Sequence, residues 1–174
     1  MLMSAILDLK GMNMIRGIHH VAVSTPDLDR IVRFYCDVMG AEQVYEGGWE
    51  KGSELIDGIV GLKDSSCRQA MLKFGNAYLE FFEYQTPEPR PGDPTRPVCD
   101  HGYTHFAIDV TDIDAEYERL KAAGVKFNCP PPDFEGGPIR ATYGRDPDGN
   151  VIEIQEIKDT GHEFYLDAWS GARG

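Results

Sequence analysis

The sequence lacks long hydrophobic runs: nowhere do about 20 consecutive apolar residues occur, the length that a membrane-spanning helix needs. Its first segment, MLMSAILDLKGMN, also lacks the basic start and long apolar stretch of a secretory leader. We therefore expect no transmembrane helix and no signal peptide, and we expect the protein in the cytoplasm. Residues 1–15 are interpreted as an N-terminal extension.

Closely spaced cysteines are absent as well. The four cysteines form no C-x-x-C pair, which excludes a zinc-ribbon site, and they are Cys36, Cys67, Cys99 and Cys129. Reduced thiols of an intracellular protein are the simplest expectation for all four, because such compartments disfavour disulfides.

Positive charge is scarce too. The chain has 17 Lys and Arg against 29 Asp and Glu, a net charge of −12. Nucleic-acid binders need a basic footprint, and anionic membranes attract basic segments, so we expect neither as a partner. We therefore expect a small-molecule substrate as the partner. An anionic substrate stays possible, because a few Lys or Arg side chains near the site could outweigh the overall negative charge.

What the sequence does contain is an internal repeat. Residues 17–23 (GIHHVAV) and 102–108 (GYTHFAI) both read as short strands of apolar and β-branched residues with an embedded histidine. The repeat aligns His20 with His105 and His19 with Thr104. Each strand is followed by a predicted helix that begins at aspartates and ends at a glycine, Gly40 or Gly124.

A glutamate recurs in the last strand of each copy. The segment NAYLEFFE places Glu80 among apolar residues, and GNVIEIQE does the same for Glu153. An isolated carboxylate in an apolar strand is costly to bury unless it is paired or bound to a cation. Finding it twice at equivalent positions indicates a function.

Each copy is predicted as strand, helix, strand, strand, strand, an α+β unit. The expected elements are 17–24, 27–39, 42–49, 67–74 and 77–84, then 103–109, 112–123, 125–129, 139–145 and 150–156. The first copy has about eleven extra, glycine-rich residues, interpreted as a long mobile loop. The predicted organisation is an extension (1–15), a first module (16–86), a proline-rich connector (87–101), a second module (102–158) and a tail (159–174). We expect a short docked helix in the tail.

The two histidines and two glutamates suit a divalent metal ion. Neutral imidazoles with carboxylates bind Zn, Ni, Co, Mn or Fe(II), and four protein ligands leave two positions open on an octahedral ion. Two adjacent substrate oxygens would then bind side by side. His20, Glu80, His105 and Glu153 are the predicted metal ligands, whereas strand alternation predicts that His19 faces the opposite side.

Other side chains are candidate substrate contacts. The basic candidates for an anionic substrate are Arg68, Lys73, Arg140 and Arg145, each more simply a solvated surface residue. The aromatic candidates for lining a cup are Tyr45, Trp49, Tyr78, Phe82 and Tyr143, each more simply a core residue.

These motifs resemble the vicinal oxygen chelate superfamily, which includes glyoxalases, bleomycin-resistance proteins and extradiol dioxygenases. The resemblance spans residues 16–157 and rests on IHHVAV, on YLE around Glu80, on THFAI, and on RDPDGNVIE ending at Glu153. It implies paired βαβββ modules that form a cupped mixed sheet around a metal. Its ligand positions fall on the same four residues, which disfavours the metal-free branch of the family.

The resemblance leaves the reaction open. The leading hypothesis is a metal-dependent lyase or isomerase, glyoxalase-I-like or epimerase-like, in which Glu80 or Glu153 moves a proton next to a carbonyl. An Fe(II)-dependent dioxygenase and a non-enzymatic small-ligand binder are the alternatives. A homodimer is expected, and the connector allows the modules to pair within one chain or between two.

Overall fold

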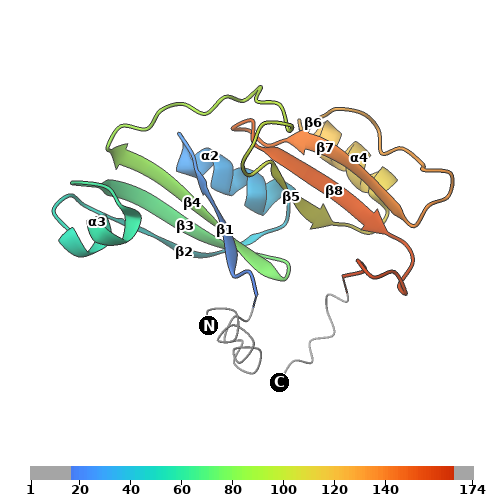
Figure 1. Cartoon of the computed structure of the whole chain (residues 1–174), viewed down its shortest axis with the longest axis horizontal. Helices are drawn as coiled ribbons and strands as arrows, with labels where there is room; N and C mark the ends of the chain where they lie inside the picture. The colour runs from blue at the N-terminus through green and yellow to red at the C-terminus, as the bar shows by residue number, and fades with distance from the viewer. Residues whose placement is uncertain (1–16, 167–174) are drawn as a thin grey trace, which may run out of the picture.

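Residues 17–166 are described by the computed structural model, and they form two four-stranded mixed sheets lying side by side (Figure 1). The strand order is β1-β4-β3-β2 in one sheet and β5-β8-β7-β6 in the other. In each sheet the first strand runs parallel to the last strand of its module, and the remaining pairs are antiparallel. The expected α+β architecture of two paired βαβββ modules is therefore confirmed.

The first module starts with β1 (His20–Ser24) and a helix, α2 (Leu28–Arg33), that continues into a π-helical turn, η2 (Phe34–Val38). Asp27 caps the helix, because its carboxylate accepts a hydrogen bond from the Arg30 N–H at 2.9 Å. Gly40 follows with a φ of +79°, the left-handed conformation that ends a helix at low cost. Strands β2 (Glu42–Trp49), β3 (Ser66–Phe74) and β4 (Ala77–Thr86) complete the sheet.

The second module repeats this order. It consists of β5 (His105–Asp109), α4 (Ile113–Ala122), β6 (Lys126–Phe127), β7 (Ile139–Arg145) and β8 (Val151–Ile157). Asp112 caps α4, and Gly124, at φ +100°, follows it. The same start and stop signals thus act in both copies of the repeat.

The extra segment of the first copy was expected to be a mobile loop, and this expectation is wrong. It contains helix α3 (Glu54–Val60), capped by the Ser53 hydroxyl and ended by Gly61 in a left-handed conformation. Of the glycines that suggested a loop, Gly58 lies inside α3 and Gly61 ends it, whereas Gly47 and Gly48 lie in β2. The carboxylate of Asp57 accepts hydrogen bonds from Ser65 and from the Asp64 N–H, which ties α3 to the start of β3.

The two modules share a continuous core. Leu28, Ile31 and Tyr35 pack on the first sheet, and Ile113 and Leu120 pack on the second. Three side chains contact both clusters: Phe34, Met39 and Phe106. Helices α2 and α4 thus bury one face of each sheet in a common interior.

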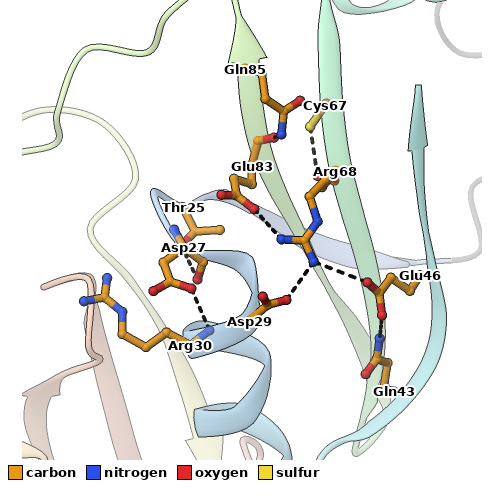
Figure 2. Close-up of polar contacts among 10 residues, drawn as sticks. All are labelled: Thr25, Asp27, Asp29, Arg30, Gln43, Glu46, Cys67, Arg68, Glu83 and Gln85. Atoms are coloured by element: carbon orange, nitrogen blue, oxygen red, sulfur yellow. Dashed lines mark hydrogen bonds and ion pairs between the residues drawn. The ribbon is translucent and has the colours of Figure 1, made fainter. Parts of the chain in front are cut away.

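Arg68 illustrates how the helix side of the first sheet is held (Figure 2). Its guanidinium pairs with Asp29 on α2 at 2.7 Å, with Glu46 on β2 at 3.4 Å and with Glu83 on β4 at 3.0 Å. Arg68 is therefore engaged in the fold and is not positioned for a substrate. Arg140 likewise pairs with Asp114, and Arg145 donates to two backbone carbonyls.

The segments outside the modules are irregular. The connector after β4 forms turns and no strand, and residues 158–166 form turns without the helix that was expected for the tail. Residues 1–16 and 167–174 lie outside the described part, including Trp169 of the predicted tail helix. Across residues 17–166, no helix is long and apolar enough to cross a membrane, and the four cysteines are free.

Candidate metal centre

The first His/Glu pair is formed by neighbouring parallel strands. In the register of β1 and β4, His20 lies opposite Tyr78 and Ala22 lies opposite Glu80. His20 and Glu80 are therefore diagonal neighbours, and alternation along the strands places them on the same face. Nε2 of His20 lies 3.2 Å from Oε2 of Glu80.

The second pair repeats this geometry. His105 lies opposite Val151 in the register of β5 and β8, and Ala107 lies opposite Glu153. Nε2 of His105 lies 2.9 Å from Oε2 of Glu153. The repeat detected in the sequence is therefore reproduced at the level of individual side-chain atoms.

Both glutamates are largely buried, whereas the histidines reach solvent. The side chains of Glu80 and Glu153 are 11% and 13% exposed, and those of His20 and His105 are 39% and 23% exposed. A carboxylate at this depth needs a partner. Each obtains one from its imidazole, and Glu80 also accepts a hydrogen bond from the side chain of Gln69 on β3.

The two pairs do not come together within one chain. Among residues 17–166, no cluster of three or more His, Cys, Asp or Glu side chains is arranged to hold a metal ion. His20 lies on β1 and His105 lies on β5, and each of these strands is the outer strand of its sheet. Within the described residues, the two His/Glu pairs are therefore separate, and each pair joins an outer strand to its inner neighbour.

Each histidine has a second contact, from the residue that precedes it. Nδ1 of His20 lies 2.9 Å from Nδ1 of His19, and Nδ1 of His105 lies 2.8 Å from Oγ1 of Thr104. His19 was expected to face away from His20. It precedes the first residue of β1, so strand alternation does not govern it, and its ring meets the His20 ring edge-on.

Aromatic side chains line the same faces. Tyr143 packs against the His105 ring at 4.5 Å between centroids, and burial, with the nearby charge of Glu153, raises the pKa of this tyrosine. Beyond Glu80, the rings of Phe82 and Tyr84 form a cluster with Trp49, with centroid distances of 5.8–6.0 Å. Two of the aromatic residues predicted from the sequence to line a cup, Trp49 and Phe82, thus lie together on the strand face that carries Glu80.

Sequence reasoning missed Gln69, Tyr84 and Thr104. Gln69 was detectable in principle, because the tight turn between β3 and β4 fixes a register in which Gln69 lies diagonal to Glu80. Thr104 stands at the repeat position of His19, which was the available signal. Tyr84 follows Phe82 by two residues on β4 and shares its face.

The comparisons with known proteins agree with this fold. Residues 17–154 match the family model of the Glyoxalase/Bleomycin resistance protein/Dioxygenase superfamily. The chain is 36% identical over 149 residues to 2-epi-5-epi-valiolone epimerase from Actinomyces sp., with 79% of this chain and 78% of that protein covered. It is 29% identical to a probable lactoylglutathione lyase of Vibrio parahaemolyticus, with 80% of this chain and 89% of that protein covered.

Solved structures show the same fold. A glyoxalase family protein from Bacillus cereus superposes with a TM-score of 0.75 at 23% identity, covering 84% of this chain and 97% of that chain. The fosfomycin resistance protein FosX from Listeria monocytogenes, solved with Mn(II) and sulfate, superposes with a TM-score of 0.53 at 21% identity, covering 82% and 93%. Because the family model matches residues 17–154, most of the chain, the protein belongs to the glyoxalase/bleomycin resistance protein/dioxygenase superfamily.

Proposed function

We propose that the protein is a metal-dependent lyase or isomerase that moves a proton next to a substrate carbonyl, and that epimerisation is its reaction. The observation that carries the proposal is the pair of equivalent His/Glu contacts, 3.2 Å and 2.9 Å long. The named relatives are an epimerase and lactoylglutathione lyases, and the epimerase is the more similar of the two reported above.

The spacing within each pair fits two ligands of one ion. Donor atoms about 2.1 Å from an octahedral ion, at right angles to each other, lie about 3 Å apart. Both Nε2–Oε2 distances are close to this value. The four predicted ligands, His20, Glu80, His105 and Glu153, supply two nitrogens and two oxygens, a set suited to Zn, Ni, Co, Mn or Fe(II).

A second copy of the chain completes the site in this proposal. One chain offers two half-sites on outer strands, and neither half alone provides four ligands. If β1 of one copy lies beside β5 of its partner, each ion receives one pair from each chain. Closed two-fold symmetry then produces two identical sites per homodimer.

The chemistry follows from the carboxylates. The bound ion would act as a Lewis acid toward a substrate that chelates it through two adjacent oxygens. Gln69 holds one oxygen of Glu80 in place, whereas Glu153 lies beside Tyr143 and His105. We therefore assign Glu153 as the general base that removes the proton, and Glu80 as the group that returns it from the other side.

The aromatic cluster beside Glu80 supplies an apolar surface for the substrate in this proposal. Trp49, Phe82 and Tyr84 offer apolar faces next to the metal ligands, which suit the carbon face of a compact substrate and exclude water from the reacting carbon. Lys73 also lies on this strand face and is exposed, and no ion pair engages it within the described residues.

Proton exchange in deuterated water tests the proposal. Metal-free protein is reloaded with each candidate ion and incubated with 2-epi-5-epi-valiolone, 2-oxo acids, acyl-CoA thioesters and glutathione hemithioacetals. We expect one class of substrate to take up deuterium next to its carbonyl in a metal-dependent way, as detected by NMR. Oxygen consumption with Fe(II) would instead support a dioxygenase, and full ligand affinity without metal would support a binding protein; either result would reject the proposal.

A further inference from the structure

The residue before each predicted histidine ligand contacts the ring nitrogen that faces away from the glutamate. His19 contacts Nδ1 of His20 at 2.9 Å, and Thr104 contacts Nδ1 of His105 at 2.8 Å. The two residues occupy equivalent positions in the repeat, although they differ in chemistry. In both halves, Nε2 is left to face the carboxylate.

The two contacts share one property: each partner can both donate and accept a hydrogen bond. A threonine hydroxyl does so by rotating, and a neutral imidazole does so by moving its proton between nitrogens. This property would matter if the histidine changed tautomer when it bound a metal. A neutral imidazole facing the carboxylate through Nε2 would carry its proton there to donate to the glutamate, whereas a metal ligand would need Nε2 free and the proton at Nδ1.

We propose that His19 and Thr104 are positioning residues that orient the two ligand imidazoles and allow this change of tautomer. The inference rests on the proposed metal site. In the second half, His105 loses its Nε2 proton to solvent and gains one at Nδ1 from solvent, and the Thr104 hydroxyl turns from donor to acceptor. The charge of both side chains is unchanged.

The first half requires a longer exchange. The Nε2 proton of His20 goes to solvent, Nδ1 of His20 takes the proton from Nδ1 of His19, and Nε2 of His19 takes one from solvent. His19 is exposed, so solvent reaches its outer nitrogen. Its ring is held by stacking on Tyr78, with centroids 4.9 Å apart and planes 10° from parallel. His19 is thus fixed in orientation while its proton remains exchangeable.

The direct test is ¹⁵N NMR of the histidine side chains with and without Zn²⁺, at a mildly alkaline pH where histidines are in general neutral. On zinc loading, we expect His19 to change from the Nδ1–H to the Nε2–H tautomer. We expect His20 and His105 to change from the Nε2–H to the Nδ1–H tautomer, His105 without a histidine partner. A His19 tautomer that stays unchanged would overturn the inference. A zinc-induced shift at Nε2 of His19 would also overturn it, because His19 would then be a ligand.

Matched variants test the positioning role through zinc affinity, measured by competition with a chelator. Thr104→Val keeps the shape and removes the hydroxyl, whereas Thr104→Ser keeps the hydroxyl. We expect about a 10- to 100-fold loss of affinity for the valine variant and little change for the serine variant. His19→Phe should weaken zinc binding. His19→Thr, which places a threonine as Thr104 does in the second copy of the repeat, should retain zinc binding. Equal affinities within either pair would refute the role.

These outcomes are separable from those of the proposed function. Wild-type protein that binds zinc but exchanges no substrate proton would reject the proposed reaction and leave the NMR and affinity tests valid. If the wild-type protein exchanges a substrate proton, but Thr104→Val and His19→Phe leave zinc affinity unchanged, only the positioning role is rejected.

Discussion

The Tyr35 hydroxyl donates a hydrogen bond to Oδ2 of Asp146 at 3.2 Å, joining η2 of the first module to the turn between β7 and β8 of the second. Both side chains are buried, at 0% and 6% exposure. The Asp146 carboxylate also accepts hydrogen bonds from the Asp148 and Asn150 backbones and from the Asn150 side chain. One aspartate thus closes a turn and bridges the modules.

Tyr35→Phe should lower the free energy of unfolding by about 1 kcal/mol, because it removes one hydrogen bond and leaves Asp146 its other donors. Chemical denaturation measures this change. Tyr117→Phe is the matched control in the second module, since no hydrogen bond of the Tyr117 hydroxyl is found among residues 17–166. Equal effects of the two variants would contradict the prediction.

Asp146 should make stability fall as pH rises in the acidic range. Burial raises its pKa above the ordinary 3.8. The folded state therefore binds the proton more tightly than the unfolded state does, and this stabilising contribution is lost as pH rises from 3.8 through the raised value. Urea unfolding of wild type and Asp146→Asn across pH 3.5–7 should show the wild-type advantage shrinking over that window. A pH-independent difference between them would refute this assignment.

Glu153→Gln should leave the fold intact and reduce turnover by about 10²- to 10⁴-fold, because the amide cannot take a proton. Circular dichroism checks the fold, and the deuterium-exchange assay checks turnover. Glu118→Gln, on the exposed face of α4, is the control and should retain turnover. Wild-type turnover in Glu153→Gln would reject the base assignment.

Metal affinity should depend on protein concentration, since each ion is proposed to draw ligands from two chains. Dilution below the dimer dissociation constant should release the ion, as followed by analytical ultracentrifugation with elemental analysis. Mixing His20→Ala with His105→Ala provides a sharper check. A heterodimer of these two variants regains one complete site out of two, so mixing should restore partial metal binding that neither variant shows alone.

Ser65→Ala should destabilise the protein by about 1–3 kcal/mol, because it breaks a part-buried chain of hydrogen bonds around the buried Ser65 hydroxyl. The Trp49 indole N–H donates to the Ser65 hydroxyl at 2.9 Å, and that hydroxyl donates to Asp57. In a Trp169→Phe background, Trp49 fluorescence should shift on losing its partner. Ser53→Ala, which removes only the cap of α3, should shift it less.

The repeat predicted much of this structure because its signals are local in the sequence. The caps at Asp27 and Asp112 and the stops at Gly40 and Gly124 lie within a few residues of the helices they bound. The choice of His20 and His105 followed from alignment of the two copies, and the structure places each beside its expected glutamate.

What the sequence did not reveal depends on contacts between distant segments. The separation of the two His/Glu pairs is set by how the modules pack through Phe34 and Phe106, which no periodicity encodes. Helix α3 was missed because its glycines resemble those of a loop. The contact of His19 with His20 was missed because alternation was applied one residue beyond the start of β1.

The shared core has a consequence for folding cooperativity. Because Phe34, Met39 and Phe106 belong to both clusters, unfolding one module strips apolar cover from the other. We therefore expect the two copies of the repeat to unfold together in a single transition, as one thermodynamic unit rather than as two linked domains. An ion bound by one His/Glu pair of the chain would then raise the melting temperature of both modules together.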